Sequence, residues 1–213
     1  MKRFLVVLLC VLAVPAAASA AISGIGGGTT ISNGQATLVA NADNPFSFIS
    51  FDDLAGQPVG NLDSLAADVV QADYGLGSPR FSVELSNGTD TKSVFVYLGD
   101  LPNLNTGGTG DTGNLLDSTL AGARVDSTQL GGPFYGTWQD ALAAAEHSGY
   151  TTISEIDVVV DGVSQTVVLD SVTINGTTYG FSPASKDGCK NGGWQIFGFE
   201  NQGECVSAFA SGK

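Results

Sequence analysis

One loop of the sequence carries oxygen-bearing side chains that suit a divalent cation. Between residues 103 and 114 the chain is polar, Gly-rich and low in apolar content. Calcium takes about six to eight oxygen ligands, which carboxylates and amides on a loop can supply. The spacing does not match the EF-hand pattern, and a solvated loop rich in turns has the same composition. The loop therefore predicts either a metal-free turn region or a calcium site, whose candidate ligands are Asp100, Asn103, Asp111 and Asp117.

Two groups of aromatic residues are candidates for a sugar-binding surface. Phe95 and Tyr97 lie on the face of an expected strand opposite its apolar residues, and Phe134, Tyr135 and Trp138 follow a Gly-Gly-Pro turn. Flat aromatic rings bind the apolar faces of sugars, while nearby Asp, Asn and Gln side chains bind the hydroxyls. The alternative is that these rings pack on the sheet and cover it. The sequence predicts Phe95, Tyr97, Tyr135 and Trp138 as ligand-binding residues.

Catalytic motifs are absent from the sequence. His147 is the sole histidine, and its neighbours Glu146 and Ser148 cannot face it from adjacent helical positions. Neither a Gly-x-Ser-x-Gly elbow nor a phosphate-binding glycine loop occurs. We therefore predict no catalytic residue. A glycan hydrolase that uses two of the 21 acidic side chains is kept as an alternative.

The two cysteines of the C-terminal region, Cys189 and Cys205, are expected to form a disulfide. An even pair at short spacing outside the cytosol is typical of a cross-link. Zinc is the rival explanation, but a four-coordinate site needs further Cys or His ligands, and His147 is the one histidine.

Turn signals and short apolar segments predict an all-β fold. Asn-Gly or Asp-Gly pairs separate segments rich in Val, Ile, Phe and Thr, the pattern of a sandwich or barrel. We expect strands at 29–40 and 45–51, a hairpin of 80–85 with 93–98, a second hairpin of 153–160 with 165–174, and a last strand at 178–181. Residues 62–72 fit either a helix or a strand.

One short helix is expected after Thr137. Thr137 and Asp140 have the spacing of an N-terminal cap, good helix formers follow, and Gly149 is a natural stop. The fold class predicted is therefore an antiparallel jelly-roll-type β-sandwich with one short helix and a disulfide-closed C-terminal tail.

The N-terminus has the pattern of a secretory signal. Lys2 and Arg3 precede an apolar run of eleven residues at 4–14, and Ala18-Ser19-Ala20 suits a signal peptidase. A membrane anchor would need about 20 apolar residues. We expect a signal peptide at 1–20, a β-sandwich domain at 21–182 and a stapled tail at 183–213.

Charge excludes two classes of partner. Removal of residues 1–20 leaves six basic and 21 acidic residues, a net charge of −15. Nucleic-acid binding depends on Lys and Arg contacts to phosphate, and an anionic membrane surface attracts basic segments. The sequence therefore predicts no nucleic-acid partner and no membrane association after signal removal.

The tail resembles a segment found in exported bacterial proteins. From Cys189 to Ser207 the chain follows the pattern Cys-Lys-Asn-Gly-Gly-Trp…Phe-x-Asn-Gln-Gly-x-Cys-Val-Ser, with Glu200 and Glu204 at positions where more varied or basic residues are expected. The resemblance implies secretion and carries no known activity. Residues 168–176 are similar to the last strand of carbohydrate-binding and concanavalin-like jelly rolls, which implies that fold.

These observations predict a secreted, extracellular, non-catalytic binding protein whose partner is a polysaccharide or a cell-surface component. Two alternatives stay open. One is a structural or surface-associated protein that interacts through its tail, and the other is the extracellular glycan hydrolase.

Overall fold

The chain folds as a sandwich of two antiparallel β-sheets. The computed structural model describes residues 22–75, 77–162, 164–183 and 185–211. Its first sheet has the order β1 (Gly24–Gly26), β4 (Phe46–Phe51), β10 (Thr152–Asp161), β6 (Arg80–Ser86), β7 (Thr91–Tyr97) and β9 (Val125–Asp126). The second has the order β2 (Thr30–Ser32), β3 (Gln35–Asn41), β11 (Ser164–Ile174), β5 (Leu65–Ala72) and β8 (Gly110–Asp111), and β12 (Thr177–Gly180) also pairs with β11. The predicted antiparallel sandwich is confirmed.

The predicted hairpin of β6 and β7 is confirmed, and so is the face that it buries. Phe81 pairs with Val96 and Val83 with Val94, and all four side chains are almost fully buried between the sheets. The opposite face of the same strands carries polar and aromatic residues. Strict alternation of this kind is produced by a sheet with one face on a core.

The second predicted hairpin is wrong. β10 and β11 lie in different sheets, because both edges of β10 are already paired, with β4 and with β6. β11 pairs instead with β3, β5 and β12. The link between them contains Gly162, whose φ of +127° favours glycine, and Val163 lies outside the described residues. Two strands that face each other across a core have the same alternation as two that pair, so the pattern alone did not separate the cases.

Residues 62–72 resolve as a strand. Leu65, Ala67 and Val69 of β5 are buried at every second position, and β11 and β8 pair with its two edges. The preceding residues form the short 3-10 helix η1 (Val59–Asn61). The two-residue period of the core contacts decides between the helix and the strand.

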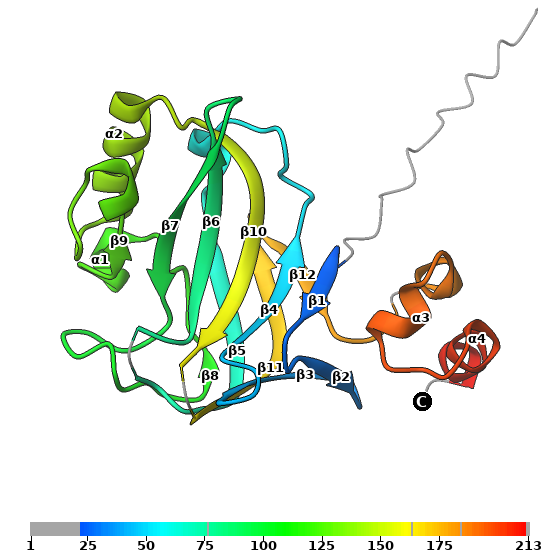
Figure 1. Cartoon of the computed structure of the whole chain (residues 1–213). Helices are drawn as coiled ribbons and strands as arrows, with labels where there is room; N and C mark the ends of the chain where they lie inside the picture. The colour runs from blue at the N-terminus through cyan, green and yellow to red at the C-terminus, as the bar shows by residue number, and fades with distance from the viewer. Residues whose placement is uncertain (1–21, 76, 163, 184, 212–213) are drawn as a thin grey trace, which may run out of the picture.

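The expected helix forms and closes one side of the sandwich. In α2 (Trp138–Ser148) the Thr137 and Asp140 side chains make a reciprocal capping box, and Gly149 ends the helix with a left-handed φ of +80°. Trp138, Ala141 and Ala145 form its buried stripe, at the spacing expected of one helix face. Figure 1 shows α2 and α1 (Ser118–Ala121) beside β7, away from the tail.

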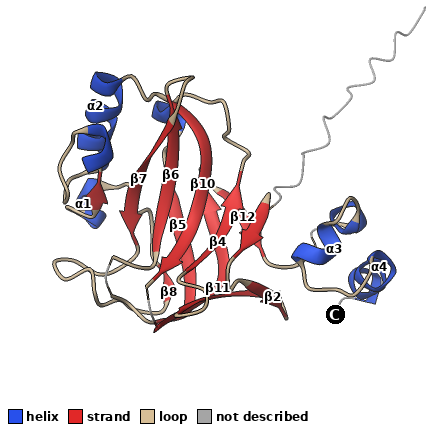
Figure 2. Ribbon diagram, in the orientation of Figure 1, coloured by secondary structure: helices blue, strands red, loops and turns tan. Residues whose placement is uncertain are grey.

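The tail contains more helix than the sequence predicted. Figure 2 shows α3 (Gly193–Ile196) and α4 (Gln202–Ser211) as two helices beyond the β1 side of the sandwich, and η3 (Lys186–Cys189) precedes them. The predicted disulfide between Cys189 and Cys205 is present and fully buried. Gly198 lets the tail approach β2 closely, because a Cβ there would lie 2.6 Å from the carbonyl oxygen of Ile31.

The predicted signal peptide, residues 1–20, lies outside the described residues. Among the residues that the structure does describe, helices of the length and apolar character needed to cross a bilayer do not occur.

Candidate functional site

Two aromatic groups that are distant in the sequence meet at one side of the first sheet. The ring centroids of Tyr97 and Tyr135 are 6.1 Å apart, and Phe134 stacks edge-on against Tyr135 at 4.4 Å. Phe134 is 52% exposed and Tyr135 55%, whereas Tyr97 is only 6% exposed. We call these three residues the aromatic platform. The rings of Phe134 and Tyr135 are accessible to a ligand, whereas the ring of Tyr97 is buried.

Short backbone pairings bring the platform together. β9 adds to the edge of β7 through Val125 and Val96. Val125 in turn exchanges two backbone hydrogen bonds with Gly136, of 2.8 and 3.0 Å. This bridge holds the turn that carries Phe134 and Tyr135 next to the strand that carries Tyr97.

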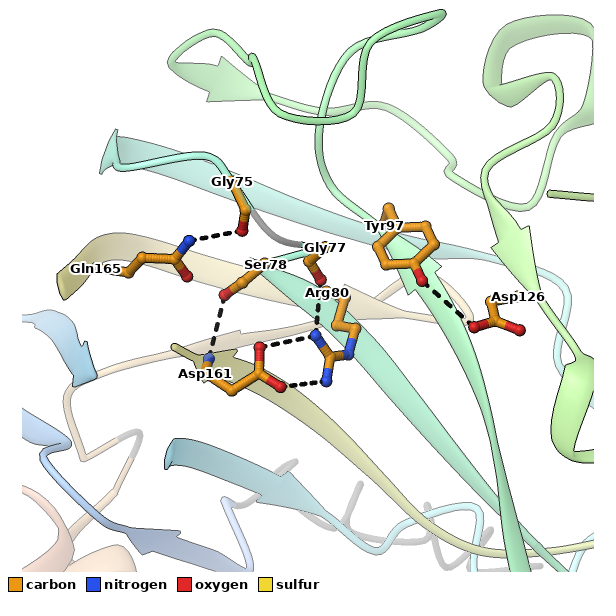
Figure 3. Close-up of polar contacts among 8 residues, drawn as sticks. All are labelled: Gly75, Gly77, Ser78, Arg80, Tyr97, Asp126, Asp161 and Gln165. Carbon is orange, nitrogen blue, oxygen red and sulfur yellow. Dashed lines mark hydrogen bonds and ion pairs between the residues drawn. The ribbon is translucent and has the colours of Figure 1, made fainter. Parts of the chain in front are cut away.

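Tyr97 is held as a neutral phenol. Its hydroxyl donates a hydrogen bond of 3.4 Å to Asp126 Oδ2, as Figure 3 shows. Burial, reinforced by the charge of Asp126, raises the pKa of Tyr97 to about 12. The ring therefore stays uncharged at any physiological pH, and the hydrogen bond to Asp126 holds its hydroxyl in place.

An ion pair lies beside the platform. Arg80 donates to Asp161 through both terminal nitrogens, at 2.8 and 2.5 Å, and also to the carbonyl of Gly77 (Figure 3). The same guanidinium lies over the Phe95 ring, 4.6 Å from its centroid. Such bidentate, stacked geometry is specific to arginine. It also means that one face of Phe95 is already occupied.

The four predicted ligand-binding residues therefore have different surroundings. Tyr97 and Tyr135 come together in the platform. Phe95 is half-buried under Arg80, and Trp138 is 5% exposed within the core. Phe134, which the sequence analysis did not select, is the third ring of the platform; its place in the same Gly-Gly-Pro turn as Tyr135 was the available signal.

The predicted calcium ligands mostly serve their own loop. Asp117 caps α1 by accepting from the Thr119 amide, and Asp111 accepts from the Gly113 amide. Asn103 accepts from the Asn105 amide at 3.2 Å. In the described part of the chain, His, Cys, Asp and Glu side chains form no group of three placed to hold a metal. Calcium binding stays a prediction.

Two of the predicted calcium ligands, Asp100 and Asp111, line a common cavity of about 190 Å³. We call it the loop cavity. Its other walls are Tyr74, Leu98, Arg124 and residues 108–110 and 112.

Three carboxyl groups gather on the outer face of the first sheet. Glu155 pairs with Glu84 across neighbouring strands, and Asp157 lies one row further, between Ser50 and Ser82. The Ser50 hydroxyl donates to Asp157 Oδ1 at 2.6 Å. Burial, together with the charges of Glu155 and Glu84, raises the pKa of Asp157 to about 6, although the Ser50 hydrogen bond opposes the shift.

A second apolar region lies where the tail meets the sandwich. A groove there is lined by rings of the tail and by Phe181, next to β12, and Phe209 of α4 is 40% exposed on it. The tail rings that line it are Phe197, Phe199 and Phe209.

Comparisons of the chain with protein-family models, with curated proteins and with solved structures gave no significant match.

Proposed function

We propose that this chain is a secreted, extracellular glycan-binding protein, and that the aromatic platform is its binding surface. The observation that carries the proposal is the exposed Phe134–Tyr135 pair, in which Tyr135 packs edge-on against the anchored Tyr97. Aromatic faces with fixed geometry give apolar contact area at small entropic cost, which suits the weakly polar face of a sugar ring.

Polar groups near the platform support a sugar ligand. The Arg80–Asp161 pair lies close to Tyr97, and its Asp161 side chain is 33% exposed, which leaves an accessible acceptor beside the platform. Sugar hydroxyls need both kinds of partner, and few groups placed beside an apolar wall are enough for orientation.

An extracellular location fits the disulfide, the leader pattern and the negative charge. A buried disulfide belongs to an oxidising compartment. The net charge of −15 without residues 1–20 disfavours polyanions and leaves neutral or cationic glycans as ligands.

Tyr135→Ala should weaken binding of the mature protein to its polysaccharide at least tenfold, because it removes the central exposed ring. The measurement is retention on a panel of insoluble polysaccharides, followed by isothermal titration with a soluble fragment of the retained one. Phe134→Ala should act in the same direction. Phe209→Ala removes another exposed ring, 40% accessible, from the tail and serves as the control.

Equal retention of Tyr135→Ala and the parent protein would overturn the proposal. Loss of retention on Phe209→Ala alone would instead favour association through the tail groove, the surface expected of a structural protein.

Asp157 favours a second candidate, a glycan hydrolase. A carboxyl with a pKa near 6 can act as a proton donor, and Glu84 lies on the same face of the sheet as a second carboxyl of the pair that glycoside hydrolysis uses. If this function holds, the protein releases reducing sugars from a susceptible polysaccharide, and both Asp157→Asn and Glu84→Gln reduce that activity at least a hundredfold. Unchanged release by both variants would exclude these acids as catalysts.

A further inference from the structure

The loop cavity combines opposite charges in a small polar space at one end of the sandwich. Arg124 is 8% exposed, so its guanidinium is almost wholly enclosed by the protein. Burial lowers the pKa of Arg124, and the nearby charge of Asp100 opposes that change. The wall of the cavity carries both a cation and carboxylates. Such a wall suits a neutral ligand whose groups can both donate and accept hydrogen bonds.

Hydroxyl and backbone groups complete the wall. The Tyr74 hydroxyl donates to the carbonyl of Gly108 at 3.0 Å. Gly107 lets the loop pass close to that ring, since a Cβ there would lie 2.1 Å from Tyr74 Cζ. The Thr112 hydroxyl accepts from the Ala67 amide at 3.0 Å, which joins the cavity to β5. The cavity is therefore held by both sheets.

The loop cavity is joined directly to the aromatic platform. The Tyr97 amide donates to the carbonyl of Arg124 at 3.1 Å, and Arg124 Nη1 donates to the carbonyl of Tyr97 at 3.3 Å. Arg124 also comes immediately before β9, the strand that positions the Tyr135 turn. One backbone segment therefore sets the position of both features.

We infer that the loop cavity receives the terminal sugar residue of a glycan chain whose next sugars lie on the aromatic platform. Asp100 and Arg124, which both line the cavity, would bind hydroxyls of that residue as an acceptor and a donor. At about 190 Å³ the cavity is smaller than the roughly 300–1,000 Å³ of sites for larger ligands, so it has room for a single sugar unit, which we take to be the terminal one. The inference rests on the proposed glycan-binding function.

The first test counts chain ends. Partial acid hydrolysis of the bound polysaccharide raises the number of ends at constant mass, and the apparent affinity per unit mass should rise in proportion. An affinity per mass that stays constant or falls as the ends increase would overturn the inference.

The second test blocks the cavity. Thr109 lines it and is exposed, so Thr109→Phe fills the space with little effect on folding. Thr109→Phe and Asp100→Asn should each lower the affinity for short oligosaccharides of the bound glycan at least tenfold. Thr89→Phe, at an exposed position in the turn between β6 and β7, is the matched control.

The outcomes separate the two proposals. If Tyr135→Ala abolishes binding and the two cavity variants bind like the parent, the chain-end inference is wrong and the platform proposal stands. If Tyr135→Ala binds like the parent, or if the polysaccharide and oligosaccharide panels give no binding, both proposals are overturned.

Discussion

Replacing Cys189 and Cys205 together with serine should destabilise the tail by about 3 kcal/mol, the value expected for opening a loop of this length. The cysteines are 16 positions apart in the chain, and both side chains are fully buried. α4 has ten residues, which is too short for a stable isolated helix. The cross-link to η3 therefore supplies much of what keeps α4 folded.

Hydrogen exchange followed by mass spectrometry would measure this effect. In the double serine variant, peptides from residues 185–211 should lose protection, whereas peptides from β10 and β6 should keep theirs. Reduction of the parent protein under native conditions should reproduce the pattern. Tail peptides that stay protected in the variant would show that packing alone holds the tail.

Asp157→Asn should raise the free energy of unfolding by about 1–3 kcal/mol above pH 7 and have little effect near pH 4. The reason is that the pKa of Asp157 is about 6 in the folded protein, against an ordinary value of 3.8. Because the folded pKa is the higher one, its contribution to stability is fully present below about pH 4. That contribution is lost as the pH rises through 6. Each unit of pKa difference is worth about 1.4 kcal/mol, reduced here by partial solvent screening.

Urea denaturation between pH 4 and pH 8 would measure this difference. Asparagine keeps an oxygen that can accept from the Ser50 hydroxyl, so the variant removes the charge and retains the shape. Asp43→Asn, at an exposed turn position, is the control and should show no comparable pH-dependent gain. A constant difference between Asp157→Asn and the parent at all pH values would contradict the buried-charge explanation.

The strands were predictable because alternation reports burial on one face. Phe81, Val83 and Leu85 mark their face without ambiguity, and the Asn87-Gly88 turn fixes their partner strand. Alternation does not report which sheet a strand belongs to, and for this reason β10 and β11 were paired wrongly. The tail helices escaped prediction because α3 has only four residues and both helices have a glycine in their first turn.

The candidate site was predictable only in part. Tyr97 and Tyr135 have the right chemistry, but their contact depends on the two-residue strand β9, which is too short to leave a periodic signal. Trp138 could have been assigned to the core, since Ala141 and Ala145 share its helix face. The burial of Asp157 follows from its cross-strand neighbours, which the sequence does not identify.

The link between β10 and β11 has a consequence for how the chain reaches its folded state. These two strands have a partner on each side, and they come late in the sequence. Their partners lie far upstream; Ser50 and Asp157, for example, are 107 positions apart. The first sheet cannot close before residue 161 is available, nor the second before residue 174, and folding that depends on such distant pairs is slow. β3 and β4 therefore stay without their long-range partners, β11 and β10, until most of the chain is present.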